Sequence, residues 1–355
     1  MHDTKLSAGG CYGLLLILAA TIALIEYGGL IDRQGSLLIT LTFWSAVIQG
    51  AVAVVAVTVL VKAKWISSLR RELLALYPLL LLLALLFVLL WPQLDLYPWY
   101  EQPTAWLNRP FFLGRNLASL LLTYLAGRHL ALHSADGESS GNRPAVLYLL
   151  AFVVSQSLVG YDWLMSAAYP WINTMFGLYF FTEALYAGIA TSGIGLLLYY
   201  RPRMQLAPEQ TALYLRDVGL LLFGFSILWT GLFFAQFLLI WYANLPEEVH
   251  FVTERLGHSP GLELCWLFLI GLFLAPFMVL LGGRAKGDLR FVSAVAVLVL
   301  VGLFAERLFI LHPVIPWHGG ALLLYNGLIL LMLLLTLHSS DRLLPQTLTK
   351  GDHSP

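Results

Sequence analysis

Charge is what this sequence has least of. Only 11% of its 355 residues are Asp, Glu, Lys or Arg, whereas 59% are hydrophobic, and the mean hydropathy is +0.80. A soluble globular protein carries about 25% charged residues, so this chain cannot cover a water-facing surface. The composition therefore excludes a soluble enzyme, a nucleic-acid binder and a disordered tail protein, and it predicts an integral membrane protein in the lipid bilayer. The 20 basic residues balance the 20 acidic ones, so net charge identifies no partner.

Cysteine is nearly absent as well. Cys11 and Cys265 are too few for an iron–sulfur cluster, which normally takes four thiolates. No Cys-x-x-Cys-His motif is present for covalent haem. The sequence also lacks a Walker loop, a G-x-G-x-x-G after a strand and an H-E-x-x-H motif. We expect no cluster, covalent haem or nucleotide in this chain.

Histidines are missing from the interior of the apolar runs, where axial haem ligands would have to lie. All nine occupy run ends, loops or tails: His2, His129, His133, His250, His258, His312, His318, His338 and His353. His129 and His133 share a helix face and could suit a metal. Imidazoles in a last helical turn also cap free carbonyls, and we favour that role. The expectation is no haem and no metal site in this chain.

Long apolar runs are what the sequence has in abundance. A membrane-spanning helix needs about 20 mainly apolar residues. Ten such segments lie near residues 9–30, 37–61, 73–92, 110–132, 145–165, 171–200, 214–243, 261–283, 290–311 and 319–338. They predict an all-α fold in which residues 1–355 form a single polytopic membrane domain. No cleaved signal peptide is expected, because the first run lacks a strongly basic flank and an A-x-A site.

The basic residues lie unevenly about these spans. One side receives 15 of the 20: Lys5, Lys62, Lys64, Arg70, Arg71, Arg128, Arg143, Arg201, Arg203, Arg216, Arg284, Lys286, Arg290, Arg342 and Lys350. Because basic loops stay in the cytoplasm, this side is predicted to be cytoplasmic, with both termini on it. An even number of spans is then required, which agrees with ten. On the other side, the aromatic segment 91–109 is either an interfacial re-entrant loop or a docking surface.

Ionisable residues inside membrane spans are costly enough to suggest function. Glu183, in YFFTEALYAG, lies near the middle of the sixth predicted span, and no basic residue is expected at its depth. Tyr179 and Tyr186 share its helix face and could extend a hydrogen-bonded chain. We predict a proton pathway with Asp162 and Glu26 at the outer side, Glu183 at the centre, and Asp217 as the cytoplasmic branch.

Other charges in the spans favour a structural role. Arg115 lies one turn inside the fourth span and needs a carboxylate, which Asp162, Glu26 or Glu306 could supply. Glu306 and Arg307 are adjacent in the ninth span. We interpret Arg115, Glu306 and Arg307 as candidates for inter-helix ion pairs that fix the bundle.

Four stretches resemble one family. They are WLNRPFFLGRN at 106–116, DWLMSAAYPWINTMFGLYFF at 162–181, AQFLLIWYANLPEEVHF at 235–251 and FLAPFMVLLGGRAKGDLRF at 273–291. They resemble the ActF subunits of bacterial alternative complex III, which belong to the polysulfide-reductase-like (NrfD-like) membrane subunits. The third stretch is the most specific of the four.

This resemblance implies two four-helix bundles, spans two to five and six to nine, flanked by peripheral helices in the bacterial inner membrane. It also implies membership of a quinol:cytochrome c, or quinol:electron-acceptor, oxidoreductase of the respiratory chain. The expected partners are an NrfD-like sister subunit that binds quinol, multihaem cytochrome c and iron–sulfur subunits, and, as a further candidate, a terminal oxidase. ActF-like chains themselves carry no redox cofactor and are expected to contribute to proton translocation and assembly of the complex.

Carried over position by position, Asp162 matches the family's Asp-Trp-x-Met-Ser motif and is the best functional candidate. A second motif is matched by Gln236, Trp241, Tyr242, Asn244, Glu247 and Glu248. Two departures stand out. A histidine-containing segment is replaced by residues 167–171, and a small residue is replaced by Glu183.

Three other interpretations stay open. The chain could itself bind quinol, with Asp162 as proton acceptor between Trp163 and Tyr161. It could be a secondary transporter, because such folds contain helices broken by Gly or Pro; the candidates are Gly188, Gly193, Gly195 and Pro276. A pure scaffold would differ from the first interpretation only in moving no protons.

Overall fold

The structure is a computed structural model that describes residues 5–28, 35–63, 65–135, 142–199 and 208–344. Within these ranges it contains helices and no strand, as the all-α prediction requires. Several residues named in the sequence analysis lie outside the described residues: His2, Lys64, Arg201, Arg203, Lys350 and His353.

Nine helical segments of the described chain are long and apolar enough to cross a membrane, which supports an integral membrane protein. The tenth predicted span, 110–132, is also a helix, α5 (Arg109–Ser134). It is not among the nine because its arginine, asparagine and histidine side chains make it less apolar.

Five other predicted spans are continuous helices whose ends lie within six residues of the predicted ones. They are α1 (Ala8–Tyr27), α2 (Ser36–Leu60), α8 (Pro208–Ala243), α13 (Leu289–Leu311) and α14 (Gly319–His338). The short α15 (Ser340–Leu343) follows α14. The sixth span, α7 (Phe176–Tyr199), begins five residues later than predicted, and this shift changes the position of Glu183 in the bundle.

Three predicted spans are interrupted. The third consists of α3 (Arg70–Leu74) and α4 (Tyr77–Val88). The fifth, α6 (Arg143–Leu158), continues through the π-helical η3 (Val159–Leu164) into η4 (Met165–Ala168). The eighth contains α10 (Gly261–Leu269), the π-helical η5 (Ile270–Leu274) and α11 (Ala275–Leu280), followed by the short α12 (Gly283–Lys286). Such π-turns inside helices are often found at functional sites.

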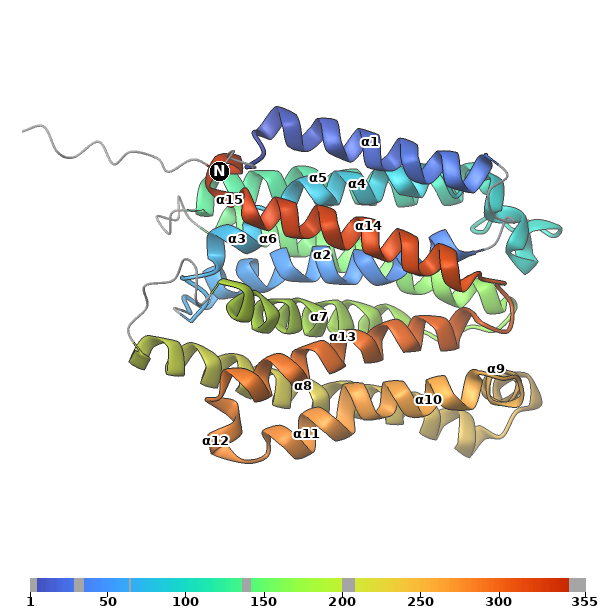
Figure 1. The fold of residues 1–355 in the computed structure, drawn as a ribbon. Helices are drawn as coiled ribbons and strands as arrows, with labels where there is room; N and C mark the ends of the chain where they lie inside the picture. The colour runs from blue at the N-terminus through green and yellow to red at the C-terminus, as the bar shows by residue number, and fades with distance from the viewer. Residues whose placement is uncertain (1–4, 29–34, 64, 136–141, 200–207, 345–355) are drawn as a thin grey trace, which may run out of the picture.

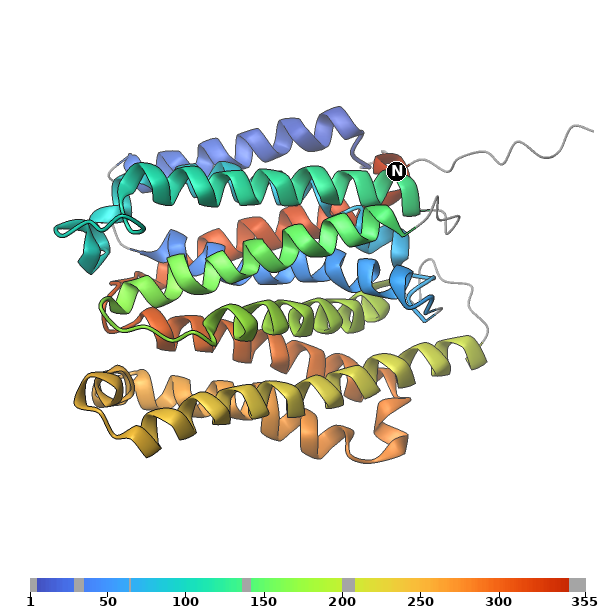
Figure 2. The same cartoon turned by 180° about the vertical axis from the view of Figure 1, so that it is seen from behind.

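The long helices run side by side along one direction (Figures 1 and 2). The helix α9 (Pro246–Gly257) lies across one end of this bundle and is seen end-on in Figure 1. We call this end the α9 face; it also carries η1 (Trp91–Leu96) and η2 (Pro98–Tyr100). The opposite end, which carries α12, is called the basic face. Segment 244–260, which connects two predicted spans, is thus largely helical.

The central helix is α2, in which all residues except Val57 and Leu60 are buried. A helix that is apolar on every side is typical of such a position. Its closest neighbour is α7: a Cβ on Gly188 would lie 2.2 Å from the Gly50 carbonyl oxygen, and one on Gly50 would lie 1.8 Å from that of Ala184. Only glycine permits this backbone approach, which fixes α7 against the core.

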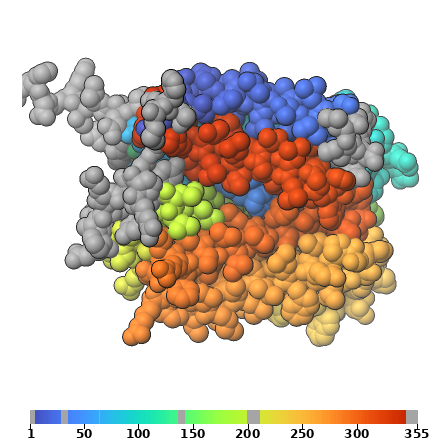
Figure 3. Space-filling model, viewed as in Figure 1, coloured from blue at the N-terminus to red at the C-terminus, as the bar shows by residue number. Residues whose placement is uncertain are grey.

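The outer helices leave large apolar side chains exposed, as a lipid-facing surface requires. Leu16, Ile17 and Leu24 of α1 are each more than half exposed. In the space-filling view, α1, α14 and the segment from α10 to α13 form one broad surface that covers most of α2 (Figure 3).

Both ends of the described chain meet at the basic face. The Lys5 ammonium lies 3.2 Å from an Asp341 carboxylate oxygen, and Arg342 donates a 2.7 Å hydrogen bond to the Lys5 carbonyl oxygen. The first and last helices therefore begin and end on the same side of the bundle.

Candidate functional site

The most unusual feature of the bundle interior is a cluster of three charged side chains. Glu183 comes from α7, whereas Glu306 and Arg307 come from α13. Arg307 Nη2 lies 2.7 Å from Glu183 Oε2, and Arg307 Nη1 lies 3.2 Å from Glu306 Oε2. Their exposed fractions are 0%, 2% and 1%, so one buried guanidinium bridges two buried carboxyl groups.

Neutral side chains complete the cluster. The Tyr179 hydroxyl donates a hydrogen bond to Glu306 Oε1. From α8, the Trp229 indole donates a 3.0 Å hydrogen bond to Glu183 Oε1. The Arg307 guanidinium carbon lies 4.4 Å from the centre of the Phe180 ring, which adds a cation–π contact. Three of the four carboxyl oxygens thus accept a hydrogen bond, whereas Glu183 Oε2 has only the ion pair with Arg307.

The sequence spacing explains how these groups meet. Tyr179 and Glu183 are four residues apart and share one face of α7. The facing helix α13 approaches α7 at another glycine, since a Cβ on Gly193 would lie 3.2 Å from the Ala296 side chain of α13. Since α7, α8 and α13 pack on one another, their polar side chains can meet only inside the bundle.

The charge count of this cluster is uneven. Two ionised carboxylates and one guanidinium sum to one negative charge, with no described cation nearby to balance it. An unbalanced charge in a buried, low-dielectric site is costly, and a carboxyl group takes up a proton to avoid it. One bound proton brings the net charge of the three side chains to zero. The cluster therefore has the charges expected of a site that binds a single proton.

This arrangement corrects two expectations about Glu183. A basic residue does occur at its depth, because Arg307 contacts it directly. It also lies off-centre, since it is about 10 Å from the start of α7 at 1.5 Å per residue, in a helix of 24 residues. Both errors arise because the chain enters α7 only at Phe176, after an irregular segment that the hydrophobic pattern had counted as helix.

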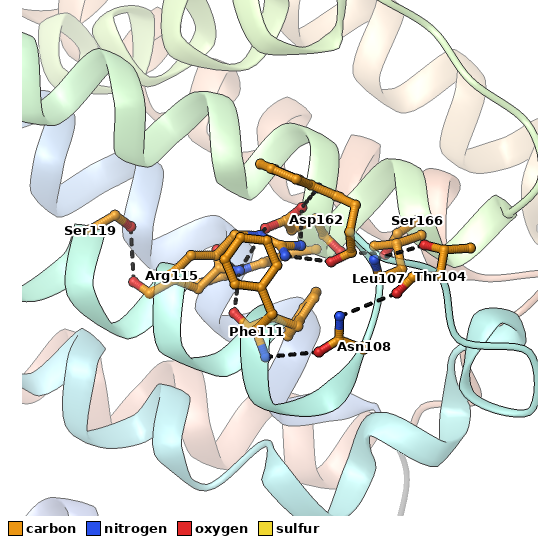
Figure 4. A network of polar contacts seen from close by, with 12 residues as sticks. Thr104, Leu107, Asn108, Phe111, Arg115, Ser119, Asp162 and Ser166 are labelled. Atoms are coloured by element: carbon orange, nitrogen blue, oxygen red, sulfur yellow. Dashed lines mark hydrogen bonds and ion pairs between the residues drawn. The ribbon is translucent and has the colours of Figure 1, made fainter.

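The second polar network surrounds Asp162 in the π-helical η3 (Figure 4). The Arg115 guanidinium donates two hydrogen bonds to the Asp162 carboxylate, at 2.7 and 2.9 Å. Asn116 and Trp106 donate two more, at 2.7 and 3.1 Å. Of the three partners suggested for Arg115, the structure supplies Asp162. Four donors fill the acceptor positions of this carboxylate, so it anchors segment 91–109 to α5 and has no open position for a quinol hydroxyl.

Tyr97 and Trp106 were not singled out in the sequence. Tyr97 donates a 2.9 Å hydrogen bond to the Trp163 carbonyl oxygen. Burial raises the pKa of Tyr97 well above its usual value, and the negative charge of Asp162 adds to this shift, so the hydroxyl stays a donor. The Trp and Tyr content of segment 91–109 was the available signal. Only the fold shows that the rings of Tyr97 and Trp99 pack inward against Phe112 of α5, whereas Trp106 is half exposed.

The other members of the predicted proton pathway do not join Glu183. Glu26 accepts a 3.2 Å hydrogen bond from Gln93, beside α1 and α4. Tyr186 donates to the Leu272 carbonyl oxygen at 3.2 Å. Asp217 lies about 18 Å along α8 from Trp229 at 1.5 Å per residue. Among the described residues, Tyr179 is the one member of that set that the fold brings into the Glu183 cluster.

The residues of the second family motif lie at the α9 face. Gln236 is 9% exposed and accepts a 2.9 Å hydrogen bond from Asn173. Trp241 and Tyr242, at 66% and 84% exposure, point outward. Asn244, which has a positive φ of 47°, ends the turn into α9, and Glu247 and Glu248 fall in the first turn of that helix, where acidic side chains favour the helix dipole.

The chain matches no protein-family model, and no curated protein matches it. Any assignment of function therefore rests on the residues and on their geometry. In the described part of the chain, no group of three His, Cys, Asp or Glu side chains is arranged to hold a metal. His133 Nδ1 lies 2.8 Å from the His129 carbonyl oxygen, a contact within the last turns of α5.

The helix breaks that a transporter would need are not found in α7. This helix runs without interruption through Gly188, Gly193 and Gly195. Gly188 is used for the contact with α2, and a Cβ on Gly193 would lie 3.2 Å from the Ala296 side chain of α13. These glycines serve close helix packing. The eighth span does depart from a regular α-helix, because η5 ends two residues before Pro276.

Proposed function

We propose that this chain is a cofactor-free, proton-carrying subunit of a membrane quinol oxidoreductase resembling alternative complex III. The cluster of Glu183, Glu306 and Arg307 would be its proton-binding site. The observation that carries the proposal is that two buried carboxyl groups share a single buried guanidinium, so that one carboxyl group has no cation of its own. Intramembrane acids of this kind are common in proton relays.

The proposed topology has ten spans, comprising the nine apolar segments and α5. The meeting of Lys5 with Asp341 supports an even number, because both chain ends then lie on one side. The excess of basic residues in the flanks of that side favours placing it in the cytoplasm of a bacterial inner membrane. The α9 face would then be extracytoplasmic. Spans two to five and six to nine would form the two four-helix bundles that the resemblance implies.

The proposed partners are an NrfD-like sister subunit that binds quinol, and multihaem cytochrome c and iron–sulfur subunits. Purification of the tagged chain from its native membrane tests this part. We expect haem c and iron–sulfur absorbance to co-purify with it. A lone polypeptide without haem-containing or iron–sulfur partners would contradict membership of such a complex.

The proton role is tested in the purified complex by the number of protons translocated per electron. Glu183→Gln and Glu306→Gln should each lower this ratio while quinol oxidation continues, because either change removes the unbalanced carboxyl group. Glu263→Gln is the matched control, since Glu263 is an exposed acid at the start of α10. If the ratio is unchanged in both cluster variants, the cluster is an ion-pair network that only stabilises the fold, and the chain is a scaffold.

A further inference from the structure

A cavity of about 300 Å³ lies directly beside the buried carboxyl group of Glu306. Tyr179 and Glu306 form part of its wall. A second polar patch comes from Asn173 and Gln236, which are hydrogen-bonded to each other. The remaining wall is mostly aromatic and aliphatic. Water enters a cavity only where polar partners are present, and these four side chains provide them in an otherwise apolar space.

A second cavity, of about 650 Å³, lies at the α9 face. Its wall includes the carboxyl groups of Glu247, Glu248 and Glu254 together with the imidazole of His250. We call this cavity the α9 cleft. Its acidic groups give it a negative potential that favours cations and protons.

The two cavities share a wall made of two stacked rings, Trp171 and Phe251. The ring centres are 3.8 Å apart and the planes differ by 11°. Trp171 comes from the segment before α7 and Phe251 comes from α9, so separate elements meet in this pair. The pair separates the α9 cleft from the space beside Glu306.

Arg255 packs on the Phe251 ring of this wall and links it to α13. Its guanidinium carbon lies 3.7 Å from the centre of the Phe251 ring, and its Nε donates a 3.0 Å hydrogen bond to the Ile310 carbonyl oxygen of α13. Arg255 is fully buried, yet its Nη2 has no hydrogen-bond partner among the described residues. A buried donor without a partner usually contacts water, which indicates that water reaches this wall. Burial lowers the pKa of Arg255 to about 10, so the group stays charged at neutral pH.

We propose that the two cavities form one route by which protons pass between Glu306 and the α9 face, and that the Trp171–Phe251 pair is its closed gate. This proposal rests on the proposed proton role of the cluster and identifies its access path. The ionisable groups around Glu306 are Glu183, Arg307 and Tyr179, with the Cys265 thiol also in the cavity wall. Separation of the two rings would join the acidic cleft to this cavity.

A native cysteine thiol can be used to measure access along this path. Cys265 lines the inner cavity, whereas Cys11 is fully buried in α1. A Cys11→Ala background leaves one thiol. The test measures how fast a membrane-impermeant, cationic thiosulfonate modifies Cys265 in the full chain held in lipid nanodiscs. In that background we expect slow labelling, and Phe251→Ala should raise the rate by about tenfold, the factor expected for the loss of an aromatic stacking interaction.

Two further variants complete the design. Phe251→Leu keeps an apolar side chain without a ring and should give an intermediate rate, which provides a test if the alanine variant folds poorly. Phe291→Ala is the matched control, because Phe291 is a half-exposed ring of α13 near the basic face; its rate should not change. A lipid-soluble maleimide, which reaches the thiol through the bilayer, should label every variant equally.

Equal thiosulfonate rates in the parent chain and in both Phe251 variants would overturn the gate, and so would rapid labelling of the parent chain. The labelling depends on access alone. A failed gate can therefore be told apart from a failed proton role, which the proton-to-electron ratio tests independently.

Discussion

Arg307→Met tests whether the buried cluster stabilises the fold as its geometry implies. The substitution keeps an unbranched apolar stem but removes the charge that contacts Glu183 at 2.7 Å and Glu306 at 3.2 Å. Removal of one partner from a buried ion pair costs about 3–5 kcal/mol, because the remaining charge loses its compensation. At roughly 2 °C of melting temperature per kcal/mol for a large chain, the variant should melt about 5–10 °C lower.

The assay is thermal unfolding of the full chain in detergent, followed by intrinsic tryptophan fluorescence. Arg290→Met is the control, because Arg290 is an exposed residue in the first turn of the same helix, and it should change the free energy of unfolding by less than about 0.5 kcal/mol. Adding Glu183→Gln to Arg307→Met should recover part of the loss, because one fewer carboxyl group then lacks a cation. If Arg307→Met melted like Arg290→Met, the inferred energetic role of the cluster would be wrong.

Three further substitutions test other parts of the structure. Asp162→Asn removes the carboxylate that pairs with Arg115, whose side chain is only 9% exposed. It should cost about 3 kcal/mol and speed proteolytic cutting within residues 101–106; unchanged protection would show that Asp162 does not anchor this segment. Gly188→Leu cannot fit the contact between α2 and α7, and little folded protein should be recovered, whereas Gly231→Leu, where the structure leaves open space, should fold normally. Trp229→Phe removes one hydrogen bond to a carboxylate and should lower the free energy of unfolding by about 1.5–3 kcal/mol; a loss no larger than that of an exposed substitution would count against this contact.

Much of the helical architecture could be predicted from hydrophobic runs. A run of about 20 apolar residues in a low-charge chain is typical of a membrane-spanning helix, and the ten predicted segments all contain helix. The errors lie where local geometry departs from a plain helix. The π-turns in the fifth and eighth spans leave no mark in the hydrophobic pattern, and the helix α9 is too polar and too short to be recognised as a span.

The candidate site was only partly predictable. Glu183 was identified because a buried acid is rare, and Arg307 because a buried arginine is equally rare. Their pairing could not be derived, since it depends on the depth at which α7 begins and on how α7 faces α13. Glu26 and Asp217 of the predicted pathway do not contact the cluster, which the sequence could not show, because a residue's place along the chain gives its depth but not its neighbours.

The proposed proton role requires the cluster of Glu183, Glu306 and Arg307 to hold one proton on a buried carboxyl group near neutral pH. Infrared spectroscopy of the hydrated protein detects such a proton, because a protonated carboxyl group has a C=O stretching band distinct from that of a carboxylate. We expect this band in the parent chain and its loss in Glu306→Gln and in Glu183→Gln, where one carboxylate balances Arg307 without a proton. If the parent chain lacks the band, or if the band persists in both variants, the cluster is not the proton-binding site.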